Sequence, residues 1–255
     1  DSVTITNNKI VGVNGKGGGI YLINSEGFQS TPVIKDLVIK DNTAPKGGGI
    51  YLFHVNPIIE RIQVVGNYAY NNGGGIYCFE SHPIIRNVTI TENTSTGDLG
   101  RGGGIYFDNS NPTLTDVTIT NNTAQGIYYY PGGGGIYCWN SNSVLENITI
   151  TNNTAQFNGG GIVVDYGNPN LSNIIISDNY SGGSGGGLYC WHGEPGLTEI
   201  EIDNNIKIYS NKNNQLSDTI IKTIFVRTLL LERFFGKKVS DLTISFTNEL
   251  RQLPD

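Results

Sequence analysis

Short runs in which apolar and polar residues alternate occur along most of the chain, and each run ends at asparagine-rich residues. Examples are Val88-Thr89-Ile90-Thr91 and Val117-Thr118-Ile119-Thr120. Alternation over four residues, with many β-branched side chains, is typical of a strand that has one buried face. We therefore expect short strands rather than helices over most of the sequence.

These strands belong to a repeat that is marked by runs of glycine. The point at which each run meets an aliphatic residue recurs at steps of 30, 26, 29, 31, 26 and 26 residues. A period of this length indicates a solenoid, in which each repeat stacks on the next one. The seven positions are Gly19-Ile20, Gly49-Ile50, Gly75-Ile76, Gly104-Ile105, Gly135-Ile136, Gly161-Ile162 and Gly187-Leu188.

Two further columns keep a fixed distance from the glycine run. From the second repeat on, an aliphatic residue follows nine positions after the Gly-Ile residue, and an asparagine follows eight positions later. All variation in length falls between that asparagine and the next glycine run, so only one corner of each repeat varies. The pattern predicts a parallel β-helix of about seven coils over residues 1–205, with coils about 4.8 Å apart.

The asparagine column has a structural explanation. A turn inside a stacked coil buries backbone polar groups, which need hydrogen-bond partners. An asparagine amide can donate to the coil on one side and accept from the coil on the other. We therefore predict an asparagine ladder that contacts no ligand, formed by Asn42, Asn67, Asn93, Asn122, Asn153 and Asn179.

The repeat also resembles a known group of proteins. Gly-Gly-Gly-Ile-Tyr and the segment 111–124, Asn-Pro-Thr-Leu-Thr-Asp-Val-Thr-Ile-Thr-Asn-Asn-Thr-Ala, resemble bacterial right-handed parallel β-helix proteins of the pectate-lyase-like superfamily. They are similar to chlamydial polymorphic membrane protein repeats as well, although the Phe-x-x-Asn half of that motif is missing. The resemblance implies an all-β, right-handed parallel β-helix. It implies no single activity, because the superfamily includes lyases, glycosidases, epimerases, adhesins and surface rods.

Composition and charge narrow the possible partners. The 255 residues include 35 glycines and no methionine, and the chain opens at Asp1 within the repeat pattern, so we interpret it as a processed piece of an extracellular or cell-surface protein. Residues 102–205 hold nine acidic residues and no lysine or arginine. Nucleic-acid binding needs cations along the surface, so we expect no nucleic-acid partner. We also expect no membrane span, because the apolar run at residues 218–235 is interrupted by charged residues. We expect no metal or cofactor, because no carboxylate cluster supports calcium.

The three cysteines occupy one inward position in alternate coils. Cys78, Cys138 and Cys190 each lie two residues after a Gly-Ile residue. Their backbones should be about 9.6 Å apart, from twice the strand spacing, which exceeds the separation that a disulfide allows. We therefore predict three free, buried thiols that pack in the core.

The repeat fails after residue 205, and residues 206–255 form a second region. Residues 211–215 are typical of a linker, and residues 218–235 carry an apolar stripe that predicts an amphipathic helix. Residues 241–246 resemble one further strand. We expect this region to be a cap over the open end of the β-helix, or alternatively a contact between subunits.

Aromatic residues follow each Gly-Ile position on the outward side of the predicted strand. Side chains two apart on a strand share a face, so we expect two exposed columns that form an aromatic lane suited to stacking sugar rings. The first column is Tyr21, Tyr51, Tyr77, Tyr106, Tyr137 and Tyr189. The second column is Ile23, Phe53, Phe79, Asp108, Trp139, Asp165 and Trp191.

The longest excursions of the variable corner lead into this lane. They are residues 94–101 and 123–132, in adjacent coils. Loops that carry function project from rigid scaffolds in this way, so we expect glycan binding near residues 101–139. The candidate ligand-binding residues are Tyr106, Asp108, Tyr128, Tyr129, Tyr137, Trp139 and Trp191.

A polysaccharide hydrolase or lyase is the enzymatic alternative. Asp108 and Asp165 lie two coils apart, near the carboxylate separation of about 6.5–9.5 Å that inverting glycosidases use, and His54 and Glu80 occupy the next column. However, the Asp-Asp, Gly-His-Gly and Arg-x-Lys motifs of polygalacturonases are missing, as is the calcium site of pectate lyases with its basic residue. The sequence therefore favours a structural or adhesive protein.

Two more alternatives remain open. A β-helix end can pair with another end, so self-association through the ends or residues 218–235 would build a filament. Outward Thr-x-Thr pairs resemble the flat arrays of ice-binding proteins. They are Thr4/Thr6, Thr89/Thr91, Thr118/Thr120 and Thr149/Thr151.

Overall fold

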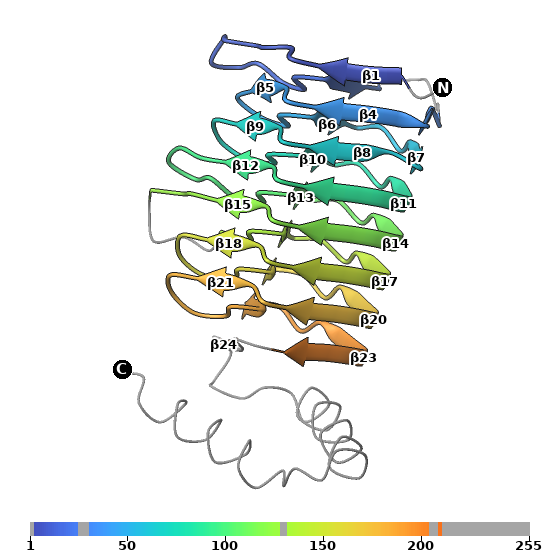
Figure 1. The fold of residues 1–255 in the computed structure, drawn as a ribbon. Helices are drawn as coiled ribbons and strands as arrows, with labels where there is room; N and C mark the ends of the chain where they lie inside the picture. Colours follow the sequence, from blue (N-terminus) through green and yellow to red (C-terminus); the bar gives the residue numbers. More distant parts are fainter. Residues whose placement is uncertain (1–2, 25–30, 128–131, 204–208, 211–255) are drawn as a thin grey trace, which may run out of the picture. The chain divides into compact units, whose positions relative to one another are not determined.

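The computed structural model describes residues 3–24, 31–127, 132–203 and 209–210, which form a parallel β-helix of about seven coils (Figure 1). Figure 1 shows the coils stacked in sequence order, from β1 (Val3–Thr6) at one end to β23 (Gly196–Asp203) at the other. Every strand pairing is parallel and joins neighbouring coils. The predicted fold class and coil number are therefore confirmed.

The coils build three sheets, and the first and last coils add no described strand to the third one. The largest contains β1, β3 (Val33–Lys35), β4 (Leu37–Lys40), β7 (Ile58–Glu60), β8 (Gln63–Val65), β11 (Ile84–Thr91), β14 (Thr113–Thr120), β17 (Val144–Thr151), β20 (Asn170–Ser177) and β23. The second contains β2 (Ile20–Ile23), β6 (Ile50–Phe53), β10 (Ile76–Phe79), β13 (Ile105–Asp108), β16 (Ile136–Trp139), β19 (Ile162–Asp165), β22 (Leu188–Trp191) and β24 (Tyr209–Ser210). The third contains β5 (Thr43–Ala44), β9 (Tyr68–Ala69), β12 (Thr94–Ser95), β15 (Thr123–Ala124), β18 (Thr154–Ala155) and β21 (Tyr180–Ser181).

The interior is filled by columns of aliphatic side chains in exact register from coil to coil. Ile76 lies opposite Ile50 and Ile105, and all three are 0% exposed. Small residues such as Ala69 and Ala124 occupy the interior beneath the third sheet and are equally buried. Burying an aliphatic side chain contributes roughly 1.5–3 kcal/mol, so the stacked columns supply most of the driving force for folding.

The coils turn at residues with positive φ angles, which most side chains avoid. One bend lies within the largest sheet, and its residues are Asp36, Arg61, Asn87, Asp116, Asn147, Asn173 and Glu199. Another follows the strands of the second sheet, and its residues are His54, Glu80, Asn109, Asn140, Tyr166 and His192. Asparagine and aspartate tolerate this conformation better than other non-glycine residues, which accounts for many of the polar residues between strands.

The glycine runs are required by close packing between coils. Gly73 has a φ of 67°, a left-handed conformation that favours glycine. At Gly74 a Cβ atom would collide with the carbonyl oxygen of Gly103 in the next coil. A side chain at either position would therefore force the coils apart.

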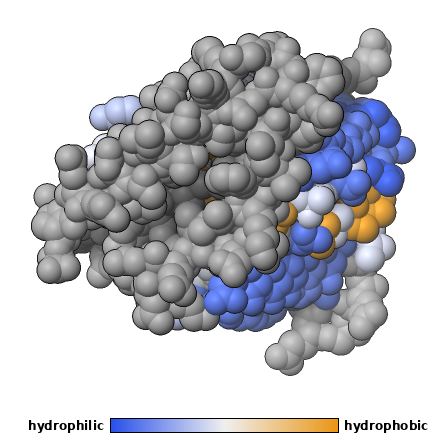
Figure 2. Space-filling model, turned by 90° about the horizontal axis from the view of Figure 1, so that it is seen from below, coloured by the Kyte–Doolittle hydropathy of each residue, from blue (hydrophilic) through white to orange (hydrophobic). Residues whose placement is uncertain are grey.

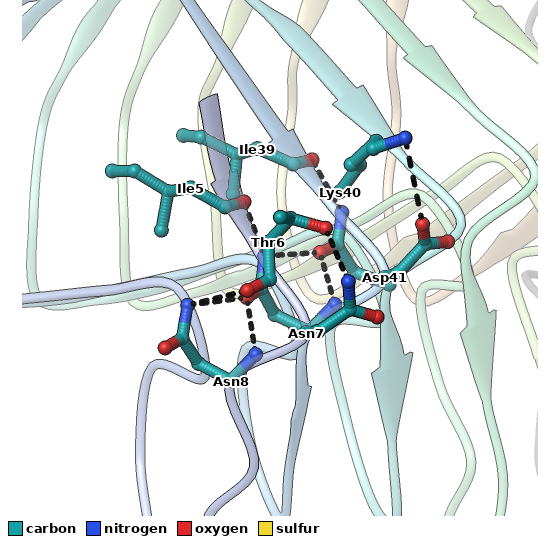
Figure 3. Close-up of polar contacts among 9 residues, drawn as sticks. Ile5, Thr6, Asn7, Asn8, Ile39, Lys40 and Asp41 are labelled. Atoms are coloured by element: carbon teal, nitrogen blue, oxygen red, sulfur yellow. Dashed lines mark hydrogen bonds and ion pairs between the residues drawn. The ribbon is translucent and has the colours of Figure 1, made fainter. Parts of the chain in front are cut away.

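The asparagine ladder runs along the corner between the largest and the third sheet. The backbone N–H and the Nδ2 of Asn67 both donate to Oδ1 of Asn93 at 2.9 Å, and Nδ2 also donates to the carbonyl oxygen of Ile39 at 2.9 Å. The same pattern joins Asn42, Asn93, Asn122, Asn153 and Asn179, all 0–2% exposed. At the first coil, Asn8 donates to Asn42 and to the carbonyl oxygen of Thr6 (Figure 3). The predicted ladder is confirmed.

The three thiols occupy the position expected for them. The register runs Cys78, Phe107, Cys138, Val164, Cys190, so a larger apolar residue separates each pair of cysteines. All three are free and at most 2% exposed. Burial raises the pKa of Cys138 and Cys190 to about 12 and raises that of Cys78 further.

The chain divides into two compact units, residues 1–215 and 216–255. Strand β24 pairs with β22, so the pairing of the second sheet extends to Tyr209 and Ser210. The expected linker at 211–215, helix at 218–235 and strand at 241–246 lie outside the described residues and stay predictions. Figure 2 views the molecule from the end at which β23 lies, and the described residues visible there are mainly hydrophilic.

Asn122→Ala should lower the free energy of unfolding by about 3 kcal/mol, because two buried donors of Asn93 would lose their acceptor. Urea denaturation followed by circular dichroism measures the change. Asn170→Ala is the control, since Asn170 is exposed on β20, and should change stability by less than about 0.5 kcal/mol. Equal effects of the two substitutions would contradict a stabilising ladder.

The thiols should resist modification in the folded protein. An exposed cysteine with the ordinary pKa of 9.0 reacts with a disulfide reagent as its thiolate, whereas these thiols are buried and stay protonated at about pH 8. We expect no fast reaction in native buffer and three equivalents of reaction in denaturant. A fast native phase would show that at least one thiol is accessible.

Candidate functional site

The second sheet carries the residues that the sequence assigns to the aromatic lane. Along β6, Ile50 and Leu52 point into the coil, so Tyr51 and Phe53 belong to the outward face. The register aligns the tyrosines of successive coils as predicted, with Tyr51, Tyr77, Tyr106 and Tyr137 in one column. The alignment of the lane therefore follows the sequence pattern, but its exposure does not.

Apart from Tyr21, which is 42% exposed, the tyrosines are buried, which corrects the expectation that they form an exposed lane. Tyr51, Tyr77, Tyr106 and Tyr137 are only 0–3% exposed, and Tyr189 is 2% exposed. Ring centroids are 4.8 Å apart between Tyr51 and Tyr77, 5.0 Å between Tyr77 and Tyr106, and 5.2 Å between Tyr106 and Tyr137. With Val163 and Tyr189 they form a hydrophobic cluster of their own, here called the tyrosine ladder. Tyr106 and Tyr137 are thus poor candidates for direct ligand contact.

Two features of the preceding turn cover these rings. A glycine with positive φ precedes each strand and brings the turn close to the tyrosine. At Gly73, for example, an added Cβ would clash with Cβ of Tyr77. Long basic side chains lie over the faces, with Lys46 Nζ 5.6 Å from the ring of Tyr77 and the Arg101 guanidinium 5.2 Å from that of Tyr137. Such cation–π contacts stabilise both partners.

The next outward column is partly exposed, and we call it the aromatic–acid column. Its members in register are Ile23, Phe53, Phe79, Asp108, Trp139, Asp165 and Trp191. Phe53, Phe79, Trp139 and Trp191 pack on the tyrosine ladder and keep part of each ring accessible. The buried ladder therefore provides a rigid base for a row of accessible rings.

Asp108 is half-buried and its two carboxylate oxygens are both held. Oδ2 accepts a hydrogen bond from the hydroxyl of Tyr77 at 2.6 Å, and Oδ1 accepts one from Nδ2 of Asn109 at 2.8 Å. Burial nevertheless raises the pKa of Asp108 above its ordinary value, because desolvation outweighs the two donors. The carboxylate is fixed in position and partly accessible.

Asp165 lies deeper and keeps one oxygen unused. The residue is 4% exposed, and Oδ2 accepts a hydrogen bond from the hydroxyl of Tyr137 at 2.7 Å. Oδ1 has no hydrogen-bond partner among the described residues, and Nδ1 of His192 is 3.8 Å away. Burial raises the pKa of Asp165 as well. A buried carboxylate oxygen without a donor is unfavourable, so this position is strained electrostatically.

The two aspartates are separated by a complete coil. In register, Asp108 lies opposite Trp139, and Trp139 lies opposite Asp165. An indole therefore lies between the two carboxylates that the enzymatic alternative pairs. Sequence reasoning missed the tyrosine donors of both aspartates, since each hydrogen bond crosses from one coil to the next.

The other two candidate catalytic residues lie together. Nδ1 of His54 is 3.2 Å from Oε2 of Glu80, and their side chains are 43% and 45% exposed. The ring of His54 contacts the edge of Phe53, with centroids 4.1 Å apart. This pair lies at the N-terminal end of the aromatic–acid column. Tyr128 and Tyr129 fall outside the described residues, so their expected role stays a prediction.

The threonine pairs line the outward face of the largest sheet. Thr89, Thr118 and Thr149 are in register on β11, β14 and β17 and are partly or fully exposed. On the neighbouring strands the same position holds Gln63 and Ile175, so the array covers three consecutive coils. Ice binding stays an untested alternative.

The described residues contain neither a metal-binding cluster nor a membrane-spanning helix. Within residues 3–203, apart from the gaps at 25–30 and 128–131, no group of three histidine, cysteine or acidic side chains could hold a metal ion. The described part of the chain also contains no helix with the length and hydropathy needed to cross a bilayer.

Comparison with known proteins identifies the family. A model described as the right handed beta helix region matches residues 1–206. The chain belongs to the right-handed β-helix family. No curated protein and no solved structure gives a significant match. This β-helix protein thus has an established family, and its function must come from its surface.

Tyr137→Phe should raise the pKa of Asp165 further, because it removes the donor that favours the ionised form. A raised pKa means that the folded state loses stability as pH rises from the ordinary value of 3.8 through the raised one. The substitution should increase this loss of folding stability. Carbon-13 NMR titration of the carboxyl group measures the pKa directly.

Tyr51→Phe provides the control, since no hydroxyl bond joins Tyr51 to either aspartate in the described residues. It should leave the titration of Asp165 unchanged. An unchanged pKa in Tyr137→Phe would mean that the hydroxyl contributes nothing to the carboxylate's electrostatics.

Proposed function

We propose that this β-helix protein is a secreted or cell-surface structural or adhesive protein whose aromatic–acid column binds a polysaccharide or cell-surface glycan. Such glycans are displayed outside the cytoplasm, which is why the proposal includes an extracellular location. The observation that carries it is the set of partly exposed rings at Phe53, Phe79, Trp139 and Trp191, aligned by the register.

The chemistry of this column suits sugar rings. The apolar C–H face of a pyranose packs on an aromatic ring, and the hydroxyl groups need hydrogen-bond acceptors nearby. Asp108 offers a fixed carboxylate next to Trp139, and Asn109 lies one residue further along the chain. Rings held on a buried base lose little conformational freedom on binding, which favours affinity.

Polysaccharide cleavage is the second candidate function. The raised pKa values of Asp108 and Asp165 are favourable for a general acid. The second carboxylate, which would activate a water molecule, would have to act across Trp139, because the indole belongs to the coil between the two carboxylates. Glycan binding needs no such rearrangement, and we prefer it for that reason.

Self-association into a filament has separate support at one end of the β-helix. Among the described residues, β1 forms strand pairs only with β4. Unpaired strand edges are potential docking sites for another chain. Glycan binding along the side of the β-helix and assembly through its end use different surfaces.

Trp139→Ala should weaken glycan binding about tenfold, as expected for a central aromatic contact. A glycan array identifies the ligand, and isothermal titration calorimetry measures the affinity. Tyr180→Ala is the matched control, since Tyr180 is 62% exposed on β21 of the third sheet, and it should have no effect. An array with no hits, with the folded protein verified by circular dichroism, would overturn the proposal.

A further inference from the structure

Aromatic and acidic residues alternate along the C-terminal part of the aromatic–acid column. From β10 to β22 the register reads Phe79, Asp108, Trp139, Asp165, Trp191. Adjacent members are separated by one strand spacing, about 4.8 Å, so the two carboxylates are about 9.6 Å apart at the backbone. That spacing is comparable with the length of two sugar units in an extended polysaccharide.

The fold itself does not require acids at these positions. Earlier coils fill the same column with Ile23, Phe53 and Phe79 and keep the same strand register. Burying a carboxylate costs free energy unless it is paired, and the raised pKa of both aspartates reflects that cost. The acids therefore call for an explanation other than packing.

The acids of this column lie near the basic residues Lys46 and Arg101, and the sequence has no further lysine or arginine between residues 102 and 205. Asp108 takes part in no ion pair within the described residues. Asp165 provides an independent observation, since it is 4% exposed and its Oδ1 accepts no hydrogen bond in the same part of the chain, with Nδ1 of His192 3.8 Å away.

We propose that the segment from Phe79 to Trp191 recognises an amino-sugar polysaccharide with free, protonated amines, whose ammonium groups bind Asp108 and Asp165 while its pyranose rings stack on Trp139 and Trp191. This inference rests on the proposed glycan-binding function and specifies the ligand class. An ammonium group supplies three donors and no acceptor, and its bonds to carboxylates are charge-assisted.

The two carboxylates have different access to such a ligand. Asp108 is half-buried, so an ammonium group can reach it directly. Asp165 is 4% exposed, and its Oδ1 is 3.8 Å from Nδ1 of His192, whose side chain is 36% exposed and stacks on Tyr166 with centroids 4.4 Å apart. Binding at Asp165 therefore requires His192 to rotate away. Asp108 should consequently contribute more to the association rate, and Asp165 should slow dissociation.

Affinity should show a maximum along the pH scale. Protonation of the carboxylates weakens binding at low pH, and deprotonation of the sugar amines weakens it at high pH. The groups that bear on Asp108 are Tyr77, Lys46, Asn109 and Glu80, and those that bear on Asp165 are Tyr137, Arg101 and His192. Lys46 and Arg101 are positive, so an acidic polysaccharide is the competing ligand that the experiment must include.

The test compares three hexasaccharides by isothermal titration calorimetry at about pH 6, where a sugar amine carries its proton. They are a glucosamine oligomer, its fully N-acetylated counterpart and a uronic-acid oligomer. The glucosamine oligomer should bind about tenfold more tightly than the acetylated one, the gain expected from one hydrogen bond to a charged group. Asp108→Asn and Asp165→Asn should each reduce that preference, and the double substitution should abolish it.

Glu146→Gln is the matched control, because it removes one exposed negative charge from β17 on the largest sheet. It should leave the preference intact, and each variant should keep the native circular dichroism spectrum and melting temperature. Equal affinity for the amine and acetylated oligomers, tighter binding of the uronic-acid oligomer, or an equal effect of Glu146→Gln would overturn the inference.

The outcomes distinguish this inference from the proposed glycan-binding function on which it rests. If the acetylated oligomer binds as well as the amine and Trp139→Ala still weakens binding, glycan recognition stands and the amine specificity is wrong. If none of the oligomers binds to the folded protein and the array has no hits, both proposals are wrong.

Discussion

The structure depends on one constraint, which is that every coil must satisfy the buried backbone of its neighbours in the same register. The asparagine ladder enforces this constraint at the corner between the largest and the third sheet, where the hydrogen bonds between paired strands are interrupted. Oδ1 of Asn93 accepts two hydrogen bonds from Asn67, and Asn93 donates two hydrogen bonds to Oδ1 of Asn122. A shift of one residue in the register would therefore leave several buried groups unpaired. Because the register is fixed there, equivalent side chains of successive coils are aligned on the second sheet.

Because of that register, residues that are far apart in the sequence form one continuous surface. Tyr77 lies one coil before Asp108, and Tyr137 lies one coil before Asp165, so each hydroxyl reaches a carboxylate two positions further along the next strand. Each pair combines a buried phenol, which has few other acceptors, with a carboxylate that needs a donor. The tyrosine ladder therefore has two roles, since it supports the accessible rings and orients the acids between them.

The sequence was sufficient to predict the solenoid, the asparagine ladder and the three free thiols, because each depends on spacing along the chain. Exposure of Tyr77 and Tyr137 could not be predicted in the same way. Strand alternation assigns a side chain to a face, but it does not show what covers that face. Here the cover comes from a positive-φ glycine turn and from Lys46 and Arg101. The cross-coil bonds of the aspartates required the register as well.

The placement of the acids has a general implication for this kind of fold. A solenoid repeats its environment, so neighbouring coils show which residues a position accepts on packing grounds alone. At the position of Asp108 and Asp165 the other coils show Ile23, Phe53, Phe79, Trp139 and Trp191, all apolar. A buried acid in such a column lowers stability at neutral pH, and a protein tends to keep unfavourable residues where function requires them. The internal repeats thus provide the comparison from which a functional role for these two residues can be inferred.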